Sequence, residues 1–405
     1  MEKAKIIREY AKQHYRKMFR EPEGNLKYKF IVPGSVYSNA LWDWDSWLTN
    51  IALRQFVTDD ISEYEKGCIL NYLNMQDEKG RLHITIKPQS TIPTLIPDKE
   101  INIHKPCLAQ HAAFIVKENN KDAEWLRPVF HKLLKFVDYY INNFRHECGI
   151  YFWQNDCAIG VDNDPSTFYR PNKSSGSILL NCFMFKELEA VCYLAEILGV
   201  DYTKYREEAD NLKSVIRKEC YDEKDGMYYS VDLNLLPVDP NSYLHKNAPR
   251  HWDCLIQRLG CWSGFLAMWC GIATQEEAER MVKENLLDEK GFWADFGVRT
   301  LSKYEKMYLI KACGNPSCWL GPIWGISNYM VFSGLVRYGF DDVAKELAEK
   351  TINLFANDIE TTGELHEYYV PETGEPVINA GFQNWNLLSI NMDAWLNGEQ
   401  RVTEF

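Results

Sequence analysis

Three segments that lie far apart in the chain place carboxylates beside aromatic rings. They are residues 42–47 (Trp-Asp-Trp-Asp-Ser-Trp), 160–165 (Gly-Val-Asp-Asn-Asp-Pro) and 366–369 (His-Glu-Tyr-Tyr). Flat rings offer apolar faces to the C–H faces of a sugar, and carboxylates bind hydroxyl groups or move protons at a glycosidic oxygen. A chain that repeats this combination is predicted to handle carbohydrate.

The two isolated acidic segments also have ordinary structural explanations. Residues 153–165 are too polar for a core helix, and Pro165 would break one. They could form an Asx-rich turn, whereas the glycine and terminal glutamate of a calcium-binding EF-hand loop are missing. Residues 366–369 lack the second histidine of a zinc-protease motif and could be a solvated acidic loop. We therefore expect no metal and no cofactor.

Composition narrows the classes of partner. The chain has 405 residues, of which 46% are apolar and 25% charged, and its net charge is −12. This charge disfavours nucleic acid, whose binding surfaces need a basic stripe, and disfavours docking on anionic membranes. There is no apolar leader and no run long enough to span a membrane. Twelve scattered cysteines without a C-x-x-C pair suggest reduced thiols in a cytoplasmic protein.

The apolar periodicity is overwhelmingly helical. Three- and four-residue steps predict about twelve helices, which start near residues 3, 45, 60, 106, 122, 177, 201, 255, 274, 322, 341 and 383. The spacers 77–105 and 221–250 lack this periodicity, and the runs 83–86 and 227–231 could be hairpin strands. We expect one domain over residues 1–405, a toroid of helical hairpins with long loops on one side. A two-domain helical protein is the alternative.

With these motifs the chain resembles glycoside hydrolases of family 63, whose clan includes the trehalases of family 37. The resemblance extends over residues 33–390. Its motifs are Trp-Asp-Ser at 44–46, Gly-x-Asp at 160–162, Trp-x-Gly-Pro-x-Trp at 319–324, and Glu-Tyr-Tyr with a later Thr-Gly at 367–374. Four motifs in the right order are specific, although each alone is weak. The family's fold is an (α/α)6 barrel, which agrees with the independent helix count.

The chain also departs from the family pattern. Residues 33–40 lack the arginine that trehalases carry before Trp-Asp-Ser, and the glycine-rich run of trehalases is missing after Glu367. The closing motif at 381–386 reads Gly-Phe-Gln-Asn-Trp-Asn rather than the Phe-Ser-Trp-Thr common in family 63. These differences argue against trehalose as the substrate.

The resemblance implies hydrolysis of an α-glycosidic bond with inversion. Asp162 would be the general acid and Glu367 the general base, although Glu364 and Glu372 lie close enough in sequence to be alternatives to Glu367. Inversion requires two carboxyl groups roughly 6.5–9.5 Å apart, with room for one water. The acid needs a raised pKa, and therefore a partly desolvated position.

Other residues are expected to bind the substrate. Trp42 and Asp45 would hold the first sugar, Trp319 would form a wall, and Gln110 could reach a hydroxyl. Arg299 is expected to hold a loop by ion pairing. The complete set of expected substrate contacts is Tyr37, Trp42, Asp45, Gln110, Trp153, Trp319, Trp324, Tyr368 and Gln383.

The sugar itself is not encoded in these motifs. A small α-glucoside is the commonest preference in the family, and mannosylglycerate or glucosylglycerate is the alternative. Lys79, Arg81, Lys87 and Lys99 in the loop 77–105 would suit an anionic aglycone. A sugar epimerase on a similar toroid would need a histidine pair, for which His104 and His111 are candidates. A binding protein that has lost catalysis is disfavoured, because both carboxylates are present.

Overall fold

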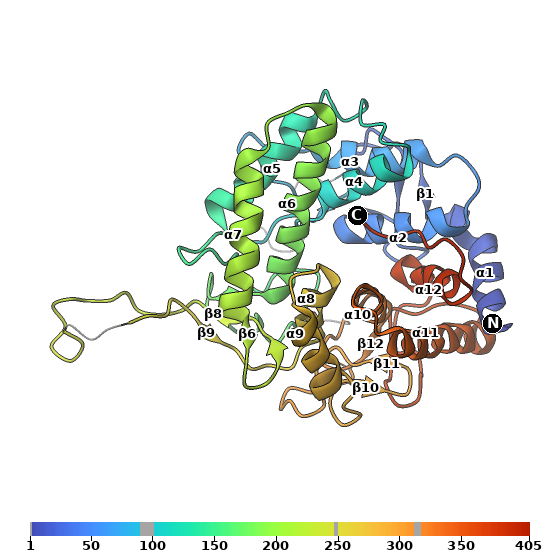
Figure 1. Ribbon diagram of the computed structural model, residues 1–405. Helices are drawn as coiled ribbons and strands as arrows, with labels where there is room; N and C mark the ends of the chain where they lie inside the picture. Colours follow the sequence, from blue (N-terminus) through green and yellow to red (C-terminus); the bar gives the residue numbers. More distant parts are fainter. Residues whose placement is uncertain (1, 90–100, 247–249, 312–316) are drawn as a thin grey trace.

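The computed structural model describes residues 2–89, 101–246, 250–311 and 317–405. These residues form twelve α-helices (Figure 1): α1 Glu2–His14, α2 Asp43–Phe56, α3 Ser62–Asn74, α4 Leu108–Glu118, α5 Phe130–Asn143, α6 Ile178–Leu198, α7 Thr203–Cys220, α8 Leu266–Trp269, α9 Gln275–Arg280, α10 Gly325–Arg337, α11 Asp341–Thr362 and α12 Ser389–Leu396.

The helices alternate between an inner and an outer ring. Helices α2, α4, α6 and α10 are buried almost all round, as expected of helices that are apolar on every side. By contrast, α7 buries one stripe that includes Tyr205, Leu212 and Ile216. The inner helices contact one another in the closed order α2, α4, α6, α8, α10, α12 and back to α2. The fold is therefore the expected (α/α)6 barrel.

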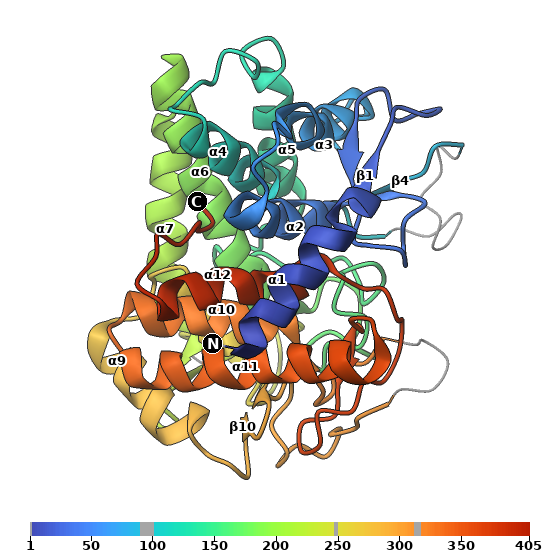
Figure 2. The ribbon, with the colours of Figure 1, turned by 90° about the vertical axis from the view of Figure 1, so that its right-hand side faces the viewer.

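This alternation gives the barrel two different ends. Each outer helix carries the chain back along the wall, so all six inner helices run in the same direction. The loops before the inner helices thus collect at one end, and the C-terminal segment 397–405 lies at the other end. Figure 2 shows this segment on the left and the loops around β1 (Phe19–Arg20) and β4 (Thr85–Ile86) on the right.

Short antiparallel strands brace the loops. In the described residues they form five two-stranded sheets and one three-stranded sheet, in the order β5-β8-β9. The remaining strands are β2 Phe30–Ile31, β3 Leu41–Trp42, β5 Ser175–Gly176, β6 Tyr221–Asp222, β7 Met227–Tyr228, β8 Val231–Asp232, β9 Leu255–Ile256, β10 Trp293–Ala294, β11 Gly297–Val298, β12 Ile323–Trp324 and β13 Tyr368–Tyr369.

The structure confirms most of the predicted elements and corrects three starts. The helix expected near 122 begins only at Phe130, after a run of turns, and the one expected near 383 follows a 3-10 turn over Asn384–Leu388. The helix start predicted near 255 is wrong, because Leu255 and Ile256 form a strand that pairs with β8. Helix α8 begins only at Leu266. The run 83–86 contributes β4, which pairs with the distant β3.

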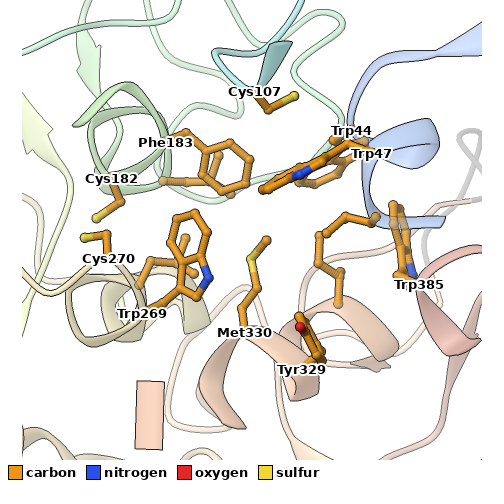
Figure 3. Packing of buried hydrophobic residues seen from close by; sticks show 14 of the residues in the cluster. Trp44, Trp47, Cys107, Cys182, Phe183, Trp269, Cys270, Tyr329, Met330 and Trp385 are labelled. Carbon is orange, nitrogen blue, oxygen red and sulfur yellow. The ribbon is translucent and has the colours of Figure 1, made fainter. Parts of the chain in front are cut away.

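The core lies inside the inner ring. Trp44, Trp47, Phe183, Trp269 and Trp385 extend into it from four different segments (Figure 3). Phe183 lies between Trp44 and Trp269, with ring centroids 6.2 and 5.4 Å apart. This aromatic packing separates the two ends of the barrel, so a cavity at either end has a rigid floor.

Two remaining expectations concern thiols and membranes. All the described cysteines except Cys148 and Cys157 are buried, and Cys313 lies outside the described residues. Among the described residues, no helix has both the length and the apolarity that a bilayer crossing demands.

Candidate active site

A cavity of about 270 Å³ lies at the loop end of the barrel and contains both predicted catalytic carboxylates. Tryptophans and acids dominate its wall, as the sequence motifs predicted. It is lined by Tyr37, Trp42, Asp43, Trp44, Asp45, Ile84, Lys105, Ala158, Gly160, Asp162, Ser317, Trp319, Trp324, Glu367, Phe382 and Trp385. Residues more than three hundred positions apart in sequence therefore share one wall.

The first acidic segment enters the cavity at the start of an inner helix. Trp42 precedes α2, and Asp43 and Asp45 lie in its first turn, where the helix dipole favours negative charge. Asp45 accepts a hydrogen bond from Asn384 Nδ2 at 2.6 Å. Burial, together with the charge of Asp43, raises the pKa of Asp45 to about 8. Asp45 is therefore protonated at neutral pH and can both donate and accept a hydrogen bond.

The Glu367 carboxylate is held by donors from three other segments. Its Oε1 accepts from Ser317 Oγ at 3.3 Å, and its Oε2 accepts from Tyr37 OH at 3.2 Å and from Asn379 Nδ2. Burial, helped by the charge of Asp162, raises the pKa of Glu367 to about 7, while these donors act to lower it. Glu367 is thus a carboxyl group in a fixed position that ionises near neutral pH.

Hydrogen bonds from neighbouring elements also hold the residues on either side of Glu367. Asp358 in α11 accepts the His366 N–H at 3.1 Å and the Tyr369 hydroxyl at 2.8 Å. Strand β13 pairs with β12, so that Tyr368 lies opposite Trp324. The position of the Glu367 segment is therefore set by two different elements, α11 and β12.

Asp162 reaches the cavity on an irregular loop with a specific geometry. Gly160 has a φ of +78°, and a Cβ there would lie 2.7 Å from Lys105 Nζ, so glycine is required. Asn163 Oδ1 accepts a hydrogen bond from the backbone N–H of Trp319 at 2.7 Å, which links the loop to the tryptophan motif. Asp164 forms an Asx turn, since its carboxylate accepts the Ser166 backbone N–H at 3.0 Å. Asp162, two residues earlier, lines the cavity.

The tryptophans pack into a continuous aromatic surface. The Trp319 and Trp324 rings are stacked with centroids 3.8 Å apart and planes 12° apart. Trp44 contacts Trp319 at 6.1 Å and Trp385 at 5.4 Å. Such a surface offers ring faces to a sugar while excluding water.

Sequence reasoning missed one charged pair in the cavity wall. Lys105 Nζ lies 2.8 Å from Asp43 Oδ2, with both side chains almost fully buried, and 4.6 Å from the centre of the Trp44 ring. Burial opposes ionisation of Asp43, but Lys105 and its hydrogen bonds hold the pKa of Asp43 below its ordinary value. A lysine directly before Pro106, at the start of an inner helix, was the available signal.

Four predicted substrate contacts do not line the cavity. The side-chain Nε2 of Gln110 donates to the carbonyls of Pro106 and Phe183, at 2.7 and 3.1 Å, so both of its N–H groups have partners inside the protein. Trp153 is buried and does not line the cavity. Tyr368 stacks on Trp324 and does not line the cavity. Gln383 is buried beside the Tyr10 hydroxyl.

The alternative bases and cations also lie outside the cavity wall. Glu364 accepts the Tyr10 hydroxyl at 2.7 Å. Glu372 pairs with Arg299 at 3.3 Å, so Arg299 holds a loop as expected. Lys79, Arg81 and Lys87 do not line the cavity, and Lys99 lies outside the described residues.

The histidines that an epimerase would need are buried elsewhere. His104 Nδ1 lies 2.5 Å from the Lys105 carbonyl, and His111 Nε2 lies 2.9 Å from Asn50 Oδ1. Burial lowers the pKa of His104 to about 4 and that of His111 to about 3. Neither lines the cavity, so the epimerase hypothesis has no histidine there. No cluster of three or more His, Cys, Asp or Glu side chains suited to a metal occurs within the described ranges.

Residues 37–386 match the family model of the mannosylglycerate hydrolase MGH1-like glycoside hydrolase domain. The chain belongs to this family of glycoside hydrolases. A mannosylglycerate hydrolase MGH1 of Selaginella moellendorffii is 30% identical over 115 residues, which are 28% of this chain and 20% of that protein. A probable mannosyl-oligosaccharide glucosidase of Schizosaccharomyces pombe is 22% identical over 307 residues, covering 68% of this chain and 35% of that protein. The chain thus spans about a third or less of these relatives.

Solved structures show the same fold over nearly the whole chain. The family 63 mannosylglycerate hydrolase of Thermus thermophilus, in complex with glucose, has a TM-score of 0.70 and 20% identity, covering 95% of this chain and 99% of that one. The neutral trehalase Nth1 of Saccharomyces cerevisiae has a TM-score of 0.63 and 14% identity, covering 90% of this chain and 73% of that one. The resemblance to family 63 and to the trehalases is confirmed.

Proposed function

We propose that the protein hydrolyses an α-glycosidic bond of a small glycoside with inversion at the anomeric carbon. The observation that carries the proposal is that Asp162 and Glu367 line one cavity together with a wall of tryptophans. A cavity of about 270 Å³ lies just below the range of roughly 300–1,000 Å³ that is usual for sites of drug-sized ligands. Its size therefore suits one sugar ring with a small aglycone.

Each carboxyl group has a distinct task in this reaction. Asp162 donates its proton to the glycosidic oxygen, and the leaving group departs as an alcohol. One water attacks the anomeric carbon from the opposite face, and its proton passes to the Glu367 carboxylate. Glu367 suits this task because three donors orient its oxygens, and because a base with a pKa near the working pH is efficient. Inversion needs a gap of roughly 6.5–9.5 Å between the two groups.

The neighbouring groups bind the sugar rather than move protons. Protonated Asp45 gives and accepts hydrogen bonds at hydroxyls, and Trp42 and Trp319 cover the apolar faces of the ring. Tyr37 donates to Glu367 at 3.2 Å, so it positions the base as well as lining the cavity. The first proposed substrate is an α-glucoside.

A second candidate substrate is mannosylglycerate or glucosylglycerate. The family model carries the name of mannosylglycerate hydrolase, and a Thermus thermophilus structure of that enzyme is in complex with Tris and D-glycerate. In this chain, Lys105 is the cation among the described residues that line the cavity. Its ammonium group offers a counter-charge to a carboxylate on the aglycone.

A substrate screen with stereochemical readout tests the proposal. Purified protein is incubated with α-linked disaccharides, mannosylglycerate and glucosylglycerate, and NMR follows the anomer that is released first. Inversion predicts the β-anomer, and early release of the α-anomer would refute it. Glu367→Gln should be inactive. Glu364→Gln is the matched control, since Glu364 bonds Tyr10 outside the cavity. If Glu367→Gln remained active and Glu364→Gln were inactive, Glu364 rather than Glu367 would be the base.

A further inference from the structure

A second cavity, of about 290 Å³, lies at the end of the barrel opposite the catalytic one. Its wall is formed by α6, α8, α10 and the C-terminal segment. Figure 2 shows the C-terminal end of the chain on the side away from the loops around β1 and β4. The residues that matter to its chemistry are Lys186, Trp269, Arg337, Arg401, Glu404 and Phe405. Three of them are cations and one is a carboxylate, in a chain whose net charge is −12.

The single carboxylate is already committed. Glu404 accepts the Trp269 indole N–H at 2.8 Å and the Tyr329 hydroxyl at 2.7 Å. Burial opposes its ionisation, but Arg401 and these donors hold the pKa of Glu404 below its ordinary value. Glu404 is therefore ionised, and the charge of Arg401 offsets it. Glu404 also acts on Lys186, but one carboxylate cannot balance three cations, so the side chains that line the cavity have an excess of two positive charges.

Of the two cations Lys186 and Arg337, Lys186 gives the stronger indication of a ligand, because it is buried. The residue is 9% exposed, and in the described part of the chain neither Lys186 nor Arg337 has an ion-pair partner within 4 Å. Lys186 Nζ lies 5.0 Å from the centre of the Phe405 ring. Burial, reinforced by the charge of Arg337, lowers the pKa of Lys186. Buried lysines without a partner charge are uncommon in proteins, because desolvation is costly.

The helix dipole explains only part of this cluster. Arg337 is the last residue of α10, where a cation is favoured by the C-terminal carbonyls. Lys186 lies in the interior of α6 and has no such benefit. An anion in the cavity would contact both charges, and Trp269, Val336 and Phe405 would provide an apolar wall for the organic part of a ligand.

We propose that this cavity binds a small phosphomonoester. A phosphate group carries between one and two negative charges near neutral pH, which matches the excess of two positive charges, and guanidinium groups bind phosphate oxygens in pairs. The site is independent of the catalytic cavity, because the packed rings of Trp44, Phe183 and Trp269 separate the two.

Calorimetric titration of the full chain tests this site. The probes are inorganic phosphate and glucose 6-phosphate, with glucose as the uncharged control and potassium chloride at matched ionic strength. We expect saturable binding of both phosphates. Lys186→Met should weaken binding about tenfold or more, since a hydrogen bond to a charged group contributes roughly 1.5–3 kcal/mol. Arg337→Gln, at the surface, should weaken it as well.

The controls separate this site from the catalytic one. Lys213→Met removes an exposed lysine of α7 and should leave phosphate binding unchanged. Absence of saturable phosphate binding to the wild-type chain overturns the proposal, and so does undiminished binding by Lys186→Met. Loss of phosphate binding on Lys105→Met, with retention in Lys186→Met, would place the anion in the catalytic cavity and likewise reject the second site.

Discussion

The two ends of the barrel carry cavities of similar size, with mostly acidic side chains at one end and mostly basic side chains at the other. The loop end gathers Asp43, Asp45, Asp162 and Glu367 around one lysine, in about 270 Å³. The opposite end gathers three cations around one carboxylate, in about 290 Å³. Both cavities have aromatic walls, and the packed core of the inner ring lies between them. The architecture therefore separates the charges along the barrel axis.

The common direction of the inner helices accounts for much of this separation. Their first turns point to the loop end, where unpaired N–H groups favour carboxylates, and their last turns point to the other end, where carbonyls favour cations. Asp43 and Asp45 in α2, and Arg337 in α10, follow this rule. Helix polarity does not explain Asp162 and Glu367, which lie on loops, or Lys186, which lies inside α6.

The largest expected effect is at the loop end. Asp162→Asn should lower kcat on unactivated glycosides by about 10²–10⁴-fold, the usual contribution of general acid catalysis, while leaving substrate binding largely intact. Steady-state rates with the best substrate of the screen measure this. Lys213→Met is the matched surface control and should keep the wild-type rate. Retention of most of the rate by Asp162→Asn would mean that another group is the acid.

The next effect compares the buried lysine at each end. Lys105→Met strands the Asp43 carboxylate, which is then a buried charge without its partner, and should lower the free energy of unfolding by roughly 3–5 kcal/mol. Lys186→Met strands no carboxylate and should be neutral or stabilising in the absence of phosphate. Urea unfolding measures both variants. Equal losses of stability in the two would show that Lys186 has a partner in the folded protein, contrary to the comparison.

The smallest effect is a shift in pH dependence at the loop end. Glu367 must be ionised to act as a base, and its pKa is about 7, so kcat/KM should fall as the pH drops through about 7. Asn379→Gly removes one donor to the Glu367 carboxylate. Its loss raises the pKa of Glu367 and shifts the acidic limb of the pH profile, where kcat/KM falls, to higher pH. Glycine tolerates the left-handed backbone of Asn379, whose φ is +58°.

A matched control for this shift exists elsewhere in the chain. Asn120 is also left-handed, with a φ of +54°, and lies outside the cavity wall, so Asn120→Gly makes the same change in backbone freedom without touching Glu367. Its pH profile should match that of the wild-type chain. An unshifted limb in Asn379→Gly would assign the limb to a group other than Glu367.

The sequence predicted the barrel and most of the cavity wall for identifiable reasons. Apolar periodicity gave twelve helices, and nine of the expected starts lie within a few residues of the observed ones. The tryptophan and acid motifs placed Trp42, Asp45, Asp162, Trp319 and Glu367 at the same end. Tyr368, next to Glu367 in sequence, stacks on Trp324 and does not line the cavity, because no local motif specifies which ring packs on which.

What the sequence alone determined is the approximate position of most helices and the gathering of acids and tryptophans into a few short segments, since both depend on local patterns. Tertiary structure decided which side chains meet. The Lys105–Asp43 pair joins residues 62 positions apart, and the turn of Gln110 toward the Phe183 carbonyl depends on the rotation of α4 against α6. Such choices follow from the packing of whole helices against one another, because the free energy of a buried polar group depends on partners that no local pattern specifies.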